Sequence, residues 1–256
     1  MKNSKKLQFL PFVSTCGGLL ILVELLVKLK VVPDFIIPSP TGVLIFLWKN
    51  ASILLWQHAL ITLWETLLGF TFALVIGCTL AICMYQFPVF ERLFYPFALL
   101  SQTIPTIALA PIFILWFGYS IWSKVAISFL IAFFPIVVGL FDGMKSTSDE
   151  SLELFYSLGA SKWQKLWHLS FPKALPQLMS SIKLAIVYAL VGASIGEWIG
   201  SAKGLGYYSR RMSGNLNAEG VFAAITLLSL MGIVLFLLVS LLEKKVIFWK
   251  QVKKKS

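Results

Sequence analysis

Charged side chains are scarce in this sequence. Only 13% of its 256 residues are Asp, Glu, Lys or Arg, whereas 58% are hydrophobic. A soluble protein of this length could not cover so much apolar surface with so few charges. Uncharged runs extend over residues 66–90 and 93–123, and a helix needs only about 20 apolar residues to cross the hydrocarbon core of a bilayer. The composition therefore excludes a soluble protein and predicts an all-α, polytopic membrane protein.

Cysteine and histidine are also rare. The three cysteines, Cys16, Cys78 and Cys83, all lie in apolar runs, so their odd number and setting argue against disulfides and metal ligands. The two histidines, His58 and His168, are far apart, and we expect both to be interfacial side chains. The sequence contains no GxxxxGK[ST] phosphate loop and no plausible nucleophile–base pair. We therefore expect a non-enzymatic chain that binds no metal and no cofactor.

Six membrane-spanning helices are predicted, and one domain over residues 1–256 is the simplest division of the chain. A cleaved signal is the alternative for the N-terminus, but the apolar stretch there is longer than a signal core requires. With both termini inside, 15 of the 22 basic residues lie on the cytoplasmic side and seven on the other, as the positive-inside rule requires. The same clustering at termini and loops argues against nucleic-acid binding. The predicted spans are about 7–29, 58–85, 93–117, 123–141, 177–199 and 219–243.

Several polar residues within these spans are candidates for a transport pathway. The third predicted helix contains Gln102, Pro105 and Pro111, and intramembrane prolines free backbone carbonyls that need a partner or a wet cavity. It is a candidate pathway wall, with a kink used only for packing as the alternative. Glu65 and Glu197 are charged residues in spanning segments, which indicates either a hydrogen-bonding role in packing or a position near the pathway.

A run of glycines follows the fifth predicted helix. Gly204 and Gly206 flank Leu205 and predict a tight outer turn with close backbone packing. A nucleotide-binding loop is not expected, because the third glycine and the strand of that motif are missing.

The longest polar interruption, about residues 142–176, predicts a cytoplasmic helix–turn–helix. Apolar residues at a spacing near three indicate a short amphipathic helix that ends at Gly159, where glycine permits a positive φ. A second helix would place Trp163 and Trp167 on one face, and Pro172 and Pro176 are expected to end it. Such a segment can lie on lipid, bind DNA or dock a partner protein; its aromatic, apolar faces favour a partner protein.

The spacing within this segment carries a specific resemblance. The pattern Glu153-x5-Gly159-x9-Leu169-x-Phe171-Pro172 resembles the EAA loop of type I ABC-importer permeases, with Leu154 and Phe155 in place of two alanines. The stretches "PDFIIPSP", "SQTIPTIALAPIFILWFGYS", "FFPIVVGLFDGM" and "GEWIGSAKGLGYY" are similar to the branch that serves taurine, aliphatic sulfonates, nitrate and pyrimidine precursors of thiamine.

The resemblance implies a permease subunit in a bacterial cytoplasmic membrane. Its partners would be two copies of a cytoplasmic ATPase that binds ATP and Mg²⁺, an extracytoplasmic solute-binding protein, a second copy of this chain, and membrane lipid. The implied substrate is a hydroxymethylpyrimidine-type precursor, with sulfonate, taurine, nitrate or bicarbonate as alternatives. An ion-coupled secondary carrier is the alternative from another class. The residues implied to couple to the ATPase are Glu153, Leu154, Phe155, Gly159, Ala160, Trp163, Trp167 and Pro172.

Overall fold

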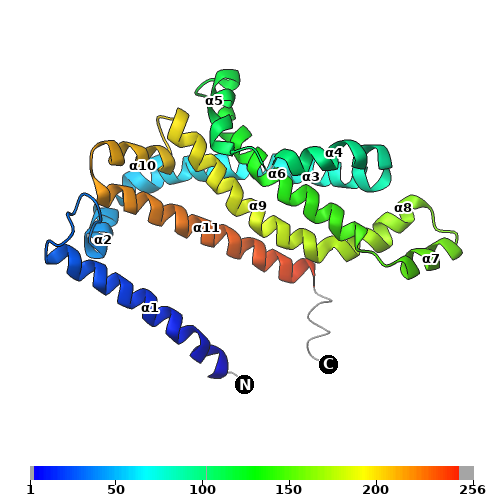
Figure 1. Ribbon diagram of the computed structural model, residues 1–256, viewed down its shortest axis with the longest axis horizontal. Coiled ribbons are helices and arrows are strands. Elements are labelled where there is room, and N and C mark those ends of the chain that lie inside the picture. Colours follow the sequence, from blue (N-terminus) through cyan, green and yellow to red (C-terminus); the bar gives the residue numbers. More distant parts are fainter. Residues whose placement is uncertain (1–2, 102, 248–256) are drawn as a thin grey trace.

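The computed structural model describes residues 3–101 and 103–247, and within these ranges the only regular elements are helices (Figure 1). This confirms the predicted all-α class. The elements are α1 (Asn3–Lys28), α2 (Pro40–Lys49), π-helical η1 (Ile53–Ala59), α3 (Leu60–Gln86), α4 (Pro88–Ser101), α5 (Thr106–Phe117), α6 (Ile121–Lys145), α7 (Asp149–Ser157), α8 (Lys162–Lys165), π-helical η2 (Leu166–Ser170), α9 (Phe171–Gly200), α10 (Leu205–Gly214) and α11 (Ala218–Val246).

Four helices in the described ranges are long and apolar enough to cross a membrane. They are Ile53–Gln86, which joins η1 to α3, then α6, then Lys162–Gly200, which joins α8, η2 and α9, and finally α11. α5 is a shorter apolar helix, and α1 is a 26-residue helix whose principal neighbour is α2. The multi-pass architecture is therefore present, and the prediction of six crossings stays a prediction.

The predicted continuous helix over 93–117 is wrong. The chain instead forms α4 and α5, and Pro105 precedes the first residue of α5 in an extended conformation. Proline has no N–H to donate and disfavours a helical residue before it. The hydroxyl and the amide of Thr103 both donate to the Leu100 carbonyl, so the last turn of α4 is capped before the break.

The expectation that Pro172 and Pro176 end the second helix of the polar segment is also wrong. One helix runs without a break for 39 residues from Lys162 to Gly200. Pro172 lies in the first turn of α9, and the wider π-helical turn η2 precedes it. A π turn changes the hydrogen-bond register, so a missing proline N–H is tolerated there. The second helix of the polar segment and the fifth predicted span therefore form one continuous helix.

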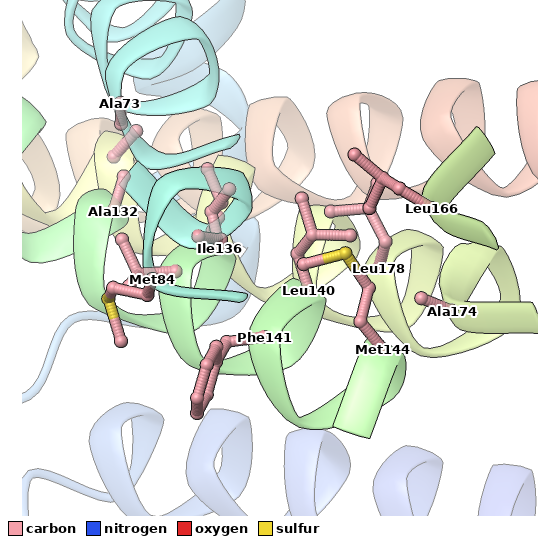
Figure 2. Packing of buried hydrophobic residues seen from close by; sticks show 14 residues of the cluster. Ala73, Met84, Ala132, Ile136, Leu140, Phe141, Met144, Leu166, Ala174 and Leu178 are labelled. Atoms are coloured by element: carbon pink, nitrogen blue, oxygen red, sulfur yellow. The ribbon is translucent and has the colours of Figure 1, made fainter. Parts of the chain in front are cut away.

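The core of the molecule lies where α6 packs along α3 and α9 (Figure 2). Ile136, Leu140 and Met144 of α6 are fully buried in one cluster, which also contains Leu166 of η2 and Ala174 of α9. Van der Waals packing of this kind, not water exclusion, holds helices together in lipid. Because the cluster reaches η2, the base of the polar segment is anchored in the core.

Lys183 of α9 pairs with Glu243 of α11. Its ammonium lies 2.8 Å from the Glu243 carboxylate, and the two side chains are only 19% and 21% exposed. Removing one partner of such a pair leaves the other charge unpaired, which costs more than removing both.

Lys183→Met and Glu243→Gln are therefore each expected to lower the thermal midpoint of the detergent-solubilised protein by about 5 °C, whereas the double variant should recover most of the loss. Circular dichroism melts of the four proteins test this. If the double variant loses the sum of both single effects, the pair contributes nothing to stability.

Candidate functional site

Two short helices, α7 and α8, lie on either side of Gly159 as the sequence predicts. Gly159 has a φ of +72°, its N–H donates to the Tyr156 carbonyl at 2.9 Å, and the Ala160 N–H donates to the Phe155 carbonyl at 3.0 Å. These two bonds form a Schellman motif, which satisfies the carbonyls at the end of a helix. The direction in which the chain leaves α7 is thus fixed by the backbone itself.

The start of α8 is fixed equally well. The Ser161 hydroxyl accepts from the Gln164 N–H, and the Gln164 side chain accepts from the Ser161 N–H at 2.7 Å. This reciprocal pair is a capping box. In addition, the Lys165 ammonium lies 4.7 Å from the centre of the Tyr156 ring, which joins α8 to α7. The turn between the helices is therefore stiff.

The segment from α7 to α8 projects from one end of the helix bundle (Figure 1). It carries uncovered apolar side chains. Leu154 and Trp163 are 59% and 55% exposed, and Trp167, Tyr156 and Leu158 are also exposed. The polar Glu153 is exposed on the same segment. Large exposed apolar patches rimmed by polar residues mark interaction sites. We call this surface, residues 149–167, the coupling segment.

Most of the predicted coupling residues fall within the coupling segment. Those in it are Glu153, Leu154, Phe155, Gly159, Ala160, Trp163 and Trp167. Pro172 does not; it lies beyond the segment in the first turn of α9, where it is half-buried.

The far end of α3 contacts the base of the coupling segment. The Tyr85 hydroxyl shares a 2.7 Å hydrogen bond with the Ser170 hydroxyl, and the Gln86 amide donates to the Lys162 carbonyl at 3.4 Å. A force on α8 therefore acts on α3 as well as on α9, which continues it.

Glu65 and Glu197, two predicted pathway candidates, meet in a buried cluster at the opposite end of the bundle. They are 2% and 0% exposed, and their carboxyl groups lie within hydrogen-bonding reach of one another. Glu197 also accepts a 2.6 Å hydrogen bond from the N–H of Gly206. A hydrogen-bonding role is thus observed for Glu197, while a role of either residue in the pathway stays a prediction.

Two glycines make the approach of Glu197 possible. Gly204 has a φ of +102°, and a Cβ at this position would collide with the Glu197 carboxyl group. A Cβ at Gly206 would collide with the backbone carbonyl of Ser194. The tight turn with close backbone packing that the glycines predict is therefore present.

Of the other two pathway candidates, Gln102 is outside the described residues. Pro105 directly precedes α5, which contributes Ile107 to a cavity of about 460 Å³ between α5, α9 and α11. The lining of this cavity is apolar apart from Ser194 and Ser229. Among the described candidates, Glu65 and Glu197 therefore lie in the polar cluster, whereas Pro105 precedes a helix that contributes to an apolar cavity.

Sequence reasoning missed three members of the polar cluster. His58, taken as interfacial, is buried, and so is Thr62. Lys124 is 3% exposed and donates to the carbonyls of Tyr119 and Ser120. His58, Thr62 and Glu65 follow one another at spacings of four and three, which places them on one helix face. That polar stripe in an apolar helix was the available signal.

Comparison with known proteins shows what this arrangement resembles. Residues 73–248 match the family model described as the inner membrane component of binding-protein-dependent transport systems. The formylaminopyrimidine transport permease ThiX of Halalkalibacterium halodurans is 45% identical over 67% of this chain and 69% of its own length. A probable ABC transporter permease of Haemophilus influenzae is 32% identical over 90% of this chain and 94% of its own length.

More distant similarities agree with these. A putative aliphatic sulfonates transport permease, SsuC of Bacillus subtilis, is 29% identical over 58% of this chain and 54% of its own length. Among solved structures, a chain of the MetNI methionine ABC transporter, described as inward-facing, superposes with a TM-score of 0.64 at 18% identity. That match covers 73% of this chain and 93% of the MetNI chain, which supports a common fold.

Proposed function

The chain belongs to the inner-membrane components of binding-protein-dependent transport systems, the permease subunits of ABC transporters, and on that premise we propose how it is coupled and what it carries. It is a multi-pass transport component and not an enzyme. We propose that the whole chain, residues 1–256, is one permease domain that moves a small solute inward by alternating access.

The coupling segment is the observation that carries the mechanism. Its turn is capped on both sides, its apolar surface is uncovered, and its second helix is the first part of a continuous helix of 39 residues. In the proposed function, the ATPase subunit holds this surface with contacts to Glu153, Trp163 and Trp167. Closure of two ATPase subunits on Mg²⁺-ATP then tilts α9 together with α3, and the bundle rocks between its open states.

The proposed topology follows from the same segment. An ATPase in the cytoplasm requires the coupling segment on the cytoplasmic side, which places Gly204 and α10 on the outer side. Six crossings with both termini inside then put the lysines at both ends of the sequence in the cytoplasm. The full transporter would contain two copies of this chain, two ATPase subunits and an extracytoplasmic solute-binding protein.

We propose a pyrimidine precursor of thiamine as the substrate. The support is the 45% identity to a permease named for formylaminopyrimidine, compared with 29% to a permease named for aliphatic sulfonates. ATP binding would belong to the partner ATPase, because this chain has no phosphate loop.

Uptake into proteoliposomes tests the proposal. The permease, its ATPase and its binding protein are reconstituted with ATP inside or outside the vesicles, and labelled formylaminopyrimidine, hydroxymethylpyrimidine, taurine and nitrate are compared. We expect uptake of a pyrimidine that depends on ATP and on the binding protein. Uptake of taurine or nitrate alone would overturn the substrate, and uptake driven by an ion gradient without an ATPase would overturn the importer.

A further inference from the structure

Three consecutive backbone N–H groups at the start of α10 are held by side chains of two other helices. Gly204 donates to the His58 Nδ1 at 3.1 Å, and Leu205 donates to the Thr62 hydroxyl oxygen at 2.9 Å. Gly206 donates to the Glu197 carboxylate at 2.6 Å. His58 and Thr62 lie on the η1–α3 helix, and Glu197 lies near the end of α9. We call this arrangement the amide clasp.

The amide clasp replaces an ordinary helix cap. The first N–H groups of a helix have no partner within the helix, and the residue that precedes α10, Gly204, has no side chain with which to cap them. The Glu197 carboxylate also complements the positive end of the helix dipole. The first N–H groups of α10 are therefore capped by side chains of η1, α3 and α9 and not by its own sequence.

Glu65 lies in the same buried cluster as Glu197. Among the described residues, Glu65 Oε2 and Glu197 Oε1 are buried without a hydrogen-bond partner, although the two carboxyl groups are within reach of one another. An ionised carboxylate only accepts hydrogen bonds, so a single hydrogen held between the two groups satisfies both. Lys124, the nearby ammonium, then balances the one remaining negative charge, as a buried site requires.

We propose that Glu197 is a positioning residue for transport, whose carboxylate, supported by Glu65 as a neutral hydrogen-bond donor, locks α3, α9 and α10 into one rigid unit. The proposal rests on the proposed function, because its purpose lies in the movement that enters at the coupling segment. α3 and α9 both contact that segment at their other ends. With the clasp intact, a tilt of the two helices carries α10 with it; without the clasp, α10 is left behind.

A thiol reporter on α10 tests the lock directly. Ser209 is 4% exposed, so Ser209→Cys, in a background where Cys16, Cys78 and Cys83 are alanine, should react slowly with N-ethylmaleimide in membranes. We expect Glu197→Ala to speed labelling at least about tenfold through local opening, and Glu197→Gln, whose amide oxygen still accepts from Gly206, to leave it slow. Glu219→Ala, which removes an acid of α11 outside the clasp, is the matched control.

Thr62→Val is a second test in case Glu197→Ala misfolds. It removes the acceptor for the Leu205 N–H but keeps the shape of the side chain. It should also accelerate labelling. Equal labelling rates in the reporter protein with Glu197 and Thr62 unaltered and in its Glu197→Ala and Thr62→Val variants would overturn the proposal. Labelling needs neither substrate nor ATPase. It therefore tests whether the amide clasp holds α10 even if no uptake is observed and the proposed function is wrong.

The second readout is the number of substrate molecules taken up per ATP hydrolysed in the reconstituted complex. For Glu197→Ala this ratio should fall about tenfold while ATP hydrolysis stays within about twofold, because the ATPase still moves α9 but α10 no longer follows. Glu197→Gln should restore the ratio. An unchanged ratio in Glu197→Ala, or a loss of hydrolysis in proportion to uptake, would contradict a positioning role.

Discussion

Gly159→Val is expected to abolish ATP-driven uptake while the protein still inserts into the membrane. Gly159 has a φ of +72°, a conformation that costs a residue with a Cβ roughly 1–2 kcal/mol and a β-branched residue more. Nothing lies within 4 Å of the position that its Cβ would occupy, so the penalty acts on the backbone alone. The chain would relieve it by opening the turn, and the coupling segment would lose the shape that the ATPase holds.

The measurement is uptake in proteoliposomes, with membrane insertion and detergent monodispersity as controls. Gly118→Val is the matched variant, because Gly118 also has a positive φ, +67°, and open space around its Cβ position but lies outside the coupling segment. We expect its uptake to fall by less than about threefold, since a valine at φ +67° and ψ −165° is at least as strained but the ATPase contact is intact. Equal losses in both variants would show that strain alone is responsible.

Glu153→Lys is a second variant at the same surface with no folding penalty, because Glu153 is exposed. Reversing its charge should weaken retention of the ATPase during copurification and lower uptake at least about tenfold. Full retention and normal uptake would mean that this surface is not the coupling site.

Gly192→Ala is expected to destabilise the whole bundle. Gly192 lies on α9 against α6, and its Cβ would stand 2.7 Å from the Ser128 Cα and 3.0 Å from the Ile127 carbonyl oxygen. These are backbone atoms, so the two helices must separate. Separation also breaks the 2.9 Å hydrogen bond from the Ser128 hydroxyl to the Ala189 carbonyl. Overpacking of this kind costs about 1–3 kcal/mol or more, and we expect the thermal midpoint to fall by about 10 °C.

Gly232→Ala is the matched control for this second prediction. Gly232 lies on α11, also in a spanning helix, and the nearest atom to its Cβ position is the end of the Leu190 side chain at 3.4 Å, an ordinary contact. Both substitutions gain the same helix propensity, so only the close approach distinguishes them. Circular dichroism melts should show a midpoint for Gly232→Ala at or above that of the unaltered protein. Equal midpoints for the two variants would mean that α6 and α9 do not approach as closely as described.

The sequence alone determined the features that depend on a few neighbouring residues. The scarcity of charge indicated membrane helices, and Gly159 marked the end of a short helix, because a positive φ is a local requirement that few other residues meet. The spacing from Glu153 to Pro172 carried the resemblance to the permease family, to which the chain belongs. Each of these signals is complete within a short stretch of chain.

Tertiary structure decided the features in which distant segments meet. The break before Pro105 and the continuity through Pro172 could not be distinguished from sequence, because a proline by itself favours a helix end at both positions and only the flanking turns differ. From sequence, Glu65 and Glu197 were two separate candidate pathway residues; the packing of α3, α6 and α9 brings them together. The amide clasp joins Gly204 to His58 across 146 residues. No local pattern specifies such a contact, because its geometry depends on how closely whole helices approach.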